Sequence, residues 1–253
     1  MTKLIEAALA HSWPTFWYEE LDSTNLEARR RASNNEYGPC WIAAKRQTQG
    51  KGRLGRQWSA PEGNLSTTAL FPFDGTLKQA SAISFIAALA VYDAAISIGA
   101  KSDGLQLKWP NDVRSNKHKL AGILIETGEV SSNLNWIALG IGVNIQSSPN
   151  VDQKTISLSE LTKTGAPNAD NLLEKLKLTF GDRLHSFLKF GFSPIREDWM
   201  KYAEGLNEMI TVQDSQSQIV GKMKGINEDG ALEVELSDGT QKLITTGDVS
   251  LEN

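Results

Sequence analysis

A short segment rich in glycine and basic residues, Gln47–Trp58, constrains this chain more than any other part of its sequence. It reads QTQGKGRLGRQW, so three glycines alternate with three cations before a closing tryptophan. Glycine allows tight turns and close approach of the backbone to a ligand. Exposed backbone N–H groups, together with lysine or arginine, bind anions. The spacing matches neither the Rossmann nor the Walker A pattern. The segment alone indicates a loop that binds phosphate or carboxylate, with a basic surface loop as the alternative.

Composition limits the class of protein. At 253 residues, the chain can form a main domain and a small one. A formal net charge of −4 argues against a nucleic-acid-binding surface. The single cysteine, Cys40, excludes an intrachain disulfide and fits a reducing compartment. The apolar stretch Leu4–Ala10 is too short for a signal peptide, and no stretch approaches the roughly 20 apolar residues of a membrane span. We therefore expect a cytoplasmic protein with no membrane partner.

The pattern of apolar residues predicts helices and strands in alternation. The segment 77–98 has apolar residues at helical spacing and Gly99 as a C-cap. Asp22 or Ser23 can cap an earlier helix, and Ser193 can cap a later one that has proline in its first turn. Helices are predicted over 23–34, 77–98 and 168–190 and from 193 onward, and strands over 40–44, 65–71, 105–109, 120–130 and 135–145.

After Gly205 the sequence changes character. Short β-prone runs are separated by two turn signals, Glu228–Gly230 and Ser237–Gly239. The runs cover residues 209–213, 218–226, 231–236 and 241–245. This pattern predicts two domains, 1–205 and 206–253, of which the second is a small β-barrel.

Two further segments narrow the interpretation of the basic loop: Lys108–Asp112 (KWPND) and Lys119–Glu126 (KLAGILIE). With the segment GKGRLGRQW, in this order and at these separations, they resemble the biotin protein ligase family, whose usual first pattern is GRGRxGRxW. Asp22–Asn25 upstream and Gly140–Asn144 downstream also match. The resemblance runs from about Trp17 to the C-terminus.

This resemblance implies an α+β fold with a mixed-sheet catalytic domain and flanking helices. That fold is similar to class II synthetases and is shared with lipoate ligases, and an SH3-like barrel follows it. Some family members carry an N-terminal helix-turn-helix module. Here the matched region starts within about 20 residues of the start of the chain, so we expect a monofunctional ligase and no DNA partner.

The implied reaction is ATP-dependent. Biotin is activated as biotinyl-5′-AMP and is then transferred to a lysine of a biotin carboxyl carrier protein domain, with ATP and Mg²⁺ as cosubstrate and ion. Neither step needs an enzyme nucleophile, but both need positive charge near the α-phosphate and exclusion of water. The sequence fits, because its motifs concentrate cations and glycines. His11, His118 and His185 lie in dissimilar contexts, so we assign none of them a catalytic role.

By the same resemblance, the catalytic residues are Lys119 and Arg53. Ser23, Thr24 and Asn25 would bind the ureido head of biotin, although Ser23 could also simply cap a helix. Biotin binding is assigned to Ser23, Thr24, Asn25, Gln47, Gly50, Lys51, Gly52, Arg53, Lys119, Gly122 and Gly140. ATP binding is assigned to Lys51, Arg53, Arg56, Trp58, Asn111, Asp112 and Lys119.

The other motif residues are expected to have more limited roles. Asp112 is the one candidate for contact with Mg²⁺, which would otherwise arrive on ATP. Gly122, Gly140 and Gly142 would leave room for biotin against adjacent strands. Lys108 and Trp109 are interpreted as strand residues beneath the site. Lys51 replaces the usual arginine and keeps the charge without the planar fork, which puts the retention of the adenylate in doubt.

Several alternatives stay open. A lipoate-type ligase shares the fold and the adenylation chemistry, although KWPND and KLAGILIE favour biotin. An octanoyl transferase needs a cysteine in a later motif than Cys40. A biotin-sensing binding module without catalysis would not need both Lys119 and Arg53. The sequence is compatible with a monomer or a homodimer, and it names neither the acceptor protein nor the role of the barrel.

Overall fold

The computed structural model describes residues 10–131, 134–149, 153–163, 165, 167–213 and 218–251. The stretch Leu4–Ala10 therefore lies outside the described residues, except for Ala10.

The larger of two sheets has seven strands in the order β1-β2-β3-β7-β6-β5-β4. Only β1 and β2 run parallel, and all other neighbours are antiparallel. The predicted mixed sheet is therefore confirmed. The strands are β1 (Thr15–Leu21), β2 (Cys40–Gln47), β3 (Leu65–Phe73), β4 (Leu105–Lys108), β5 (Asp112–Ser115), β6 (His118–Ser131) and β7 (Leu134–Val143).

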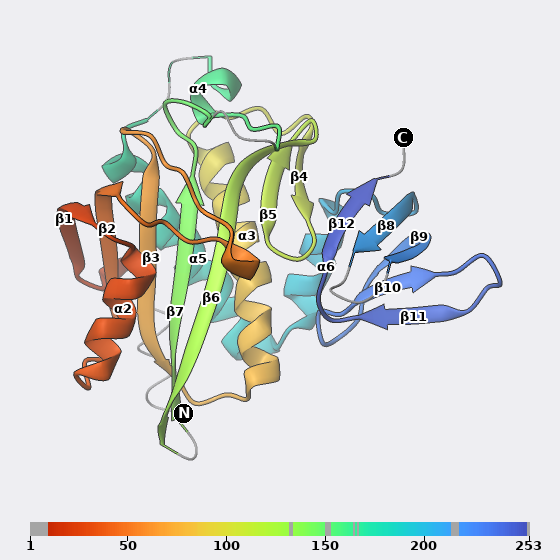
Figure 1. Ribbon diagram of the computed structural model, residues 1–253, viewed down its shortest axis with the longest axis horizontal. Coiled ribbons are helices and arrows are strands. Elements are labelled where there is room, and N and C mark those ends of the chain that lie inside the picture. The colour runs from red at the N-terminus through yellow and green to blue at the C-terminus, as the bar shows by residue number, and fades with distance from the viewer. Residues whose placement is uncertain are drawn as a thin grey trace.

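Two long helices, α3 (Leu77–Ser97) and α5 (Ala169–Phe190), cover one face of this sheet (Figure 1). Phe71 of β3 packs against Phe180 of α5 on that face. The opposite face carries α2 (Thr24–Ser33), where Ala28 packs against Leu70. The remaining helical elements are η1 (Ala10–Ser12), η2 (Arg53–Gly55), α4 (Leu158–Leu161) and α6 (Ser193–Lys201).

Helix α3 follows the predicted range closely because both of its ends are capped. Thr76 and Gln79 form a capping box at its start, and Gly99 adopts a φ of 93° just after its end. Among the described residues, one segment of it, Gln79–Ser97, is long and apolar enough to cross a membrane, but 72% of that segment is buried inside the protein. It is the central helix of the hydrophobic core.

The second sheet has five antiparallel strands in the order β11-β10-β9-β8-β12. Its buried residues, such as Ile210 and Val234, belong to the same hydrophobic core cluster as those of the main sheet. The Trp109 indole also donates a hydrogen bond to the Gly230 carbonyl, 3.0 Å away. The strands are β8 (Met209–Gln213), β9 (Gln218–Ile226), β10 (Leu232–Glu235), β11 (Gln241–Ile244) and β12 (Asp248–Leu251).

One capping prediction is wrong, and a second is confirmed in position only. Phe192 precedes α6 as its N-cap, and Ser193 is the first helical residue with proline after it. Ser23 is the N-cap of α2, but its side chain makes no capping hydrogen bond. The Asp22 carboxylate instead accepts a hydrogen bond from the Ser23 backbone N–H at 2.7 Å and forms an ion pair with Arg30. Simple helix capping therefore does not explain the Ser23 side chain.

Candidate active site

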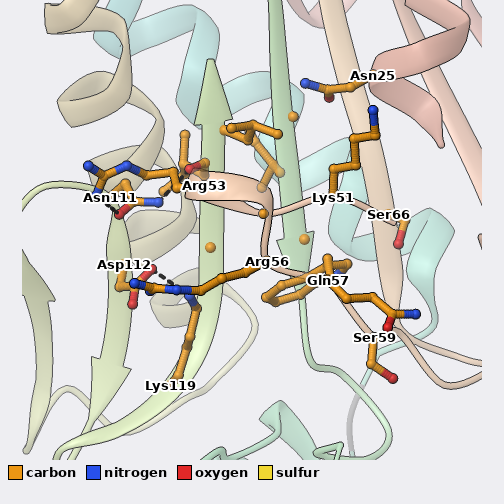
Figure 2. Close-up of a pocket in the computed structure, with 18 of the residues that line it drawn as sticks. Asn25, Lys51, Arg53, Arg56, Gln57, Ser59, Ser66, Asn111, Asp112 and Lys119 are labelled. Atoms are coloured by element: carbon orange, nitrogen blue, oxygen red, sulfur yellow. Dashed lines mark hydrogen bonds and ion pairs between the residues drawn. The ribbon is translucent and has the colours of Figure 1, made fainter. Parts of the chain in front are cut away.

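A cavity of about 470 Å³ lies on the sheet face that carries α2, beneath the loop that follows β2 (Figure 2). This volume falls within the range of small-molecule sites. Its walls come from α2, the loop, strands β2–β7 and the segment after β7, and Asp248 of β12 reaches its edge. The lining residues include Ser23, Thr24, Asn25, Gln47, Lys51, Gly52, Arg53, Arg56, Trp58, Lys108, Asn111, Asp112, Lys119, Gly122, Gly140, Asn144 and Asp248.

The structure thus brings together every residue that the sequence assigned to biotin or ATP, with the exception of Gly50. Gly50 instead closes the base of the loop, where its carbonyl accepts a hydrogen bond from the Trp58 N–H at 2.9 Å. A Cβ on Gly50 would lie 2.4 Å from the Trp58 carbonyl oxygen, so only glycine fits there.

The basic loop has a defined shape. Lys51 and Gln57 form an isolated antiparallel bridge, and the Gly52 N–H donates to the Arg56 carbonyl at 2.7 Å. Leu54 lies at its tip with a φ of 55° and is 71% exposed. In Figure 2 the loop crosses in front of the sheet and carries Lys51, Arg53 and Arg56. The loop therefore extends basic side chains along the cavity.

One end of the cavity is neutral and polar. The Gln47 Oε1 accepts hydrogen bonds from the Thr24 N–H at 2.7 Å and from the Thr24 hydroxyl at 3.2 Å. The Thr68 hydroxyl donates to Asn25 Oδ1 at 2.6 Å, and Asn25 Nδ2 donates to Glu126 at 2.9 Å. Thr24, Asn25 and Thr68 are all buried. This network holds amide and hydroxyl groups in fixed positions, which suits a small neutral head group with donors and acceptors.

The glycines of β6 and β7 line the cavity and also lie against side chains of the protein itself. A Cβ on Gly140 would lie 2.2 Å from Asn25 Oδ1, and a Cβ on Gly142 would lie 2.3 Å from the Trp58 ring. At Gly122 the Trp58 ring and the Lys119 ammonium would lie 3.2 Å from an added Cβ. A larger residue at any of these positions would therefore displace Trp58, Lys119 or Asn25 at the cavity wall. Trp58 lies over the strands, and its indole N–H is buried without a hydrogen-bond partner.

The other end of the cavity is charged. The Lys119 ammonium lies 2.7 Å from the Asp112 carboxylate, and both side chains are largely buried (Figure 2). Arg53 donates to Asn111 Oδ1 at 3.1 Å, and Asn111 in turn donates to the Ile123 carbonyl at 2.6 Å. Burial lowers the pKa of Arg53; Asp112 opposes this shift and Arg56 adds to it. The site therefore concentrates positive charge, which Asp112 offsets in part.

Asn144 and Asp248 are polar cavity residues that were not among the assigned ones. Asn144 closes the quoted GIGVN segment, and its side-chain oxygen is buried without a partner while its Nδ2 donates to the carbonyls of Lys119 and Ile156. Its motif position could have identified it. Asp248, on β12, forms an ion pair with Arg56. No sequence signal pointed to this residue, because its strand was not predicted.

The described residues contain no group of three or more His, Cys, Asp or Glu side chains that could hold a metal ion. The carboxylates that line the cavity are Asp112 and Asp248, and each forms an ion pair with a cation.

Comparisons with known proteins agree with this geometry. Residues 17–144 match the Biotin/lipoate A/B protein ligase family, and residues 205–252 match the Biotin protein ligase C terminal domain. The chain is 36% identical over 216 residues to a biotin--[acetyl-CoA-carboxylase] ligase of Paracoccus denitrificans, covering 83% of this chain and 90% of that protein. It is 29% identical to the bifunctional ligase/repressor BirA of Bacillus subtilis, covering 93% of this chain and 73% of that protein.

The fold comparison extends over nearly the whole chain. The biotin protein ligase from Aquifex aeolicus, solved in complex with biotin and ATP, superposes with a TM-score of 0.77 at 27% identity. The match covers 94% of this chain and 98% of that one. The chain therefore belongs to the biotin/lipoate A/B protein ligase family, and within it to the biotin protein ligases.

Proposed function

We propose that this protein activates biotin with ATP and transfers the biotinyl group to a lysine of a biotin carboxyl carrier protein domain. The observation that carries the proposal is a single cavity with a neutral polar end at α2 and a cationic end under the basic loop. Its support is the likeness to the Aquifex aeolicus biotin protein ligase solved with biotin and ATP, and to the Paracoccus denitrificans biotin--[acetyl-CoA-carboxylase] ligase.

Each end of the cavity suits one part of the reaction. The ureido head of biotin presents N–H donors and a carbonyl acceptor, which can bind Ser23, Thr24, Asn25 and Gln47. The valerate carboxylate would then extend toward Lys119. Its oxygen attacks the α-phosphorus of ATP, pyrophosphate leaves, and biotinyl-5′-AMP forms. The neutral amine of the carrier lysine next attacks the acyl carbon, and AMP leaves.

The cations stabilise charge that develops in these steps. Lys119 and Arg53 lie at the cationic end, largely shielded from water, where an aimed positive charge has its greatest effect on a phosphoryl transition state. We assign them the junction between the carboxylate and the α-phosphate. Lys51 and the backbone of Gly52 would wrap the same junction, and Arg56 would bind the distal phosphates.

The remaining roles are assigned to three other cavity residues, Asn144, Asn111 and Asp112. The buried Asn144 oxygen needs a donor, and the exocyclic amine of adenine supplies one. Asn111 holds Arg53 in place. Mg²⁺ would be carried by the phosphates of ATP, where it would neutralise charge, and Asp112, which pairs with Lys119, is the carboxylate that we assign to it.

We further propose that the acceptor is a carrier domain of a biotin-dependent carboxylase and that the reaction takes place in the cytoplasm without DNA or membrane. The division into 1–205 and 206–253 is retained as a description of two sheets that share one core. The Arg56–Asp248 ion pair supports an assisting role of the second sheet at the site.

The proposal is tested by mass spectrometry of a carrier domain incubated with the protein, biotin and MgATP. We expect one biotin-sized mass gain on one lysine, dependent on ATP. Lipoate in place of biotin is the matched control, since a lipoate ligase would give the corresponding gain with lipoate instead. Biotin binding without any mass gain would indicate a binding module and would contradict the proposal.

A further inference from the structure

Five charged side chains form a cluster at the edge of the main sheet, on the face that carries the cavity. Lys108 of β4 lies opposite Asp112 of β5, and Arg114 of β5 lies opposite Lys119 of β6. Glu204, from the segment that follows α6, completes the cluster by accepting a hydrogen bond from Arg114 at 2.8 Å. The backbone holds Glu204 there, since its N–H donates to the Leu107 carbonyl at 2.9 Å. These five side chains are the edge cluster.

The edge cluster contains three cations and two carboxylates, so one positive charge lacks a counter-ion. Asp112 pairs with Lys119 at 2.7 Å, and Glu204 pairs with Arg114. The side chain of Glu204 is 3% exposed and that of Arg114 is 13% exposed. Lys108 forms no hydrogen bond or ion pair within the part of the chain that the structure describes, although it lines the cavity. Lys108 is therefore the unmatched cation.

The surroundings of Lys108 make this arrangement costly without a ligand. Burial lowers the pKa of its ammonium group, and the nearby Arg114 and Lys119 act in the same direction, while Asp112 and Glu204 oppose them. A desolvated cation without a partner costs free energy, and an anion that entered the cavity would remove that cost. The geometry therefore favours an anionic ligand group at this position.

The strand order indicates which anion. The neutral end of the cavity lies over β3 and β7, where Thr68 and Gly140 contact Asn25. Lys119 lies on the next strand, β6, and Lys108 lies on the last strand, β4. Across the sheet, the order is thus head-group receptor, Lys119, Lys108. When biotin and ATP are aligned to react, their groups follow one another in the order biotin head group, carboxylate with α-phosphate, and distal phosphates.

We propose that Lys108, interpreted from sequence as a strand residue beneath the site, binds the β- or γ-phosphate of ATP and so stabilises the departing pyrophosphate. This assignment rests on the proposed function. The other four charges form the ion pairs Asp112–Lys119 and Arg114–Glu204, whereas Lys108 forms none within the described part of the chain. Because Glu204 directly precedes the C-terminal sheet, the Arg114–Glu204 pair also fixes the position of that sheet's entry beside the phosphate site.

The test compares Lys108→Met and Lys108→Gln with Lys108→Arg. Removal of an unmatched charge should leave the fold intact, and thermal unfolding checks this for each variant. We expect the two neutral variants to raise the KM for ATP and the inhibition constant for pyrophosphate by ~10-fold or more, as for loss of a charge-assisted hydrogen bond. Lys108→Arg should stay within about 3-fold of the parent protein because it keeps the charge.

Two further measurements distinguish a role at the distal phosphates from a role at biotin or at the α-phosphate. The affinity for biotin alone, and the rate of transfer from preformed biotinyl-5′-AMP to a carrier domain, should both stay within about 2-fold in the neutral variants, since neither involves distal phosphates. Gln106→Met, two residues earlier on the same strand face, is the matched control and should leave all four quantities unchanged.

Three results would overturn the assignment. An unchanged KM for ATP and unchanged pyrophosphate inhibition in the folded neutral variants would leave Lys108 a structural residue. A transfer rate that falls as far as the ATP affinity would place Lys108 at the α-phosphate. Lys108→Arg as weak as Lys108→Met would show that charge is not what matters. If the parent protein released no pyrophosphate from ATP in the presence of biotin, the proposed function would be wrong. Titration of the Lys108 variants with a non-hydrolysable ATP analogue would still test the Lys108 assignment.

Discussion

The two ends of the cavity are built in opposite ways. At the neutral end, Thr24 and Asn25 lie on α2 and Gln47 ends β2. Thr24 bonds to Gln47, and the Thr68 hydroxyl lies within hydrogen-bond distance of both Thr24 and Asn25. At the charged end, Lys119 is held by Asp112, and Arg56 is held by Asp248. The neutral end is thus a receptor in its final form, whereas these two cations form ion pairs within the protein.

This difference has an energetic consequence. A preformed set of hydrogen bonds orders few additional groups on binding, so it favours affinity for a neutral head group. A cation that must leave a carboxylate before it binds a phosphate loses part of its binding free energy to that exchange. Biotin should therefore bind independently of ATP. The affinity for ATP should be reduced by the free energy needed to break the ion pairs within the protein.

Lys119→Ala gives the largest expected effect and tests whether the charged end can be disabled alone. Removing a cation aimed at developing charge costs ~10²–10³ in rate. We expect biotin-dependent pyrophosphate release to fall by that factor while the affinity for biotin stays within a few-fold. Because Asp112 then loses its partner, Lys119→Arg is the control that keeps the ion pair. Normal adenylation by the alanine variant, or complete loss of biotin binding, would contradict the assignment.

Arg53→Gly tests retention of the intermediate at the charged end. Arg53 is assigned to both the carboxylate and the phosphate, so its loss should weaken the hold on biotinyl-5′-AMP by ~10–100-fold, as for lost hydrogen bonds to charged groups. Free adenylate would then label lysines on bystander proteins, which mass spectrometry of a mixture with an unrelated protein can count. Arg46→Gly is the matched control, since Arg46 pairs with Glu20 on the surface before the loop. Labelling confined to the carrier domain would show that Arg53 does not retain the adenylate.

Asn25→Ala tests the neutral end. Asn25 is held by Thr68 and Glu126 on the cavity wall, and removal of its amide should reduce the affinity for biotin by ~10-fold because a hydrogen bond to the head group is lost. Titration with an ATP analogue should be unchanged. Arg29→Ala is the control, since Arg29 also contacts Glu126, at 3.6 Å, but is half exposed and does not line the cavity. An equal loss of biotin affinity in both variants would assign the effect to Glu126 rather than to Asn25.

The sequence predicted elements whose signals are local. The range of α3 follows from its period and its caps, and the pair β6–β7 follows from its alternation and β-prone residues. Strand β1 was not predicted, because it lies at the sheet edge, where Phe16 and Trp17 are exposed and the burial pattern has no strict alternation. Strand β5 is four residues long, too short for a periodic signal, and follows directly on Pro110 and Asn111.

The site also combines residues that local motifs predict with residues that only long-range packing brings in. Motif residues such as Arg53 and Lys119 line one cavity because the motifs lie on neighbouring strands and the loop above them. The contacts of the glycines with Trp58 and Asn25 were not predictable, since these side chains pack onto strands distant in sequence. Asp248 could not be found either, because its partner Arg56 lies 192 residues earlier and β12 has only four residues.

Asp248→Asn is expected to give the smallest effect, and it tests whether the charged end is restrained before ATP binds. The Arg56 and Asp248 side chains are 59% and 37% exposed, and ion pairs of this kind contribute about 0–1 kcal/mol. If ATP must displace Asp248 from Arg56, the neutral variant should lower the KM for ATP by up to ~5-fold and leave biotin affinity unchanged. Glu235→Gln, which breaks the Glu235–Lys224 pair within the same sheet, should change neither quantity. A higher KM for ATP in Asp248→Asn would mean that Asp248 instead holds the loop in its binding position. The cations of the charged end would then be preorganised by their carboxylates, and the contrast between the two ends of the cavity would disappear.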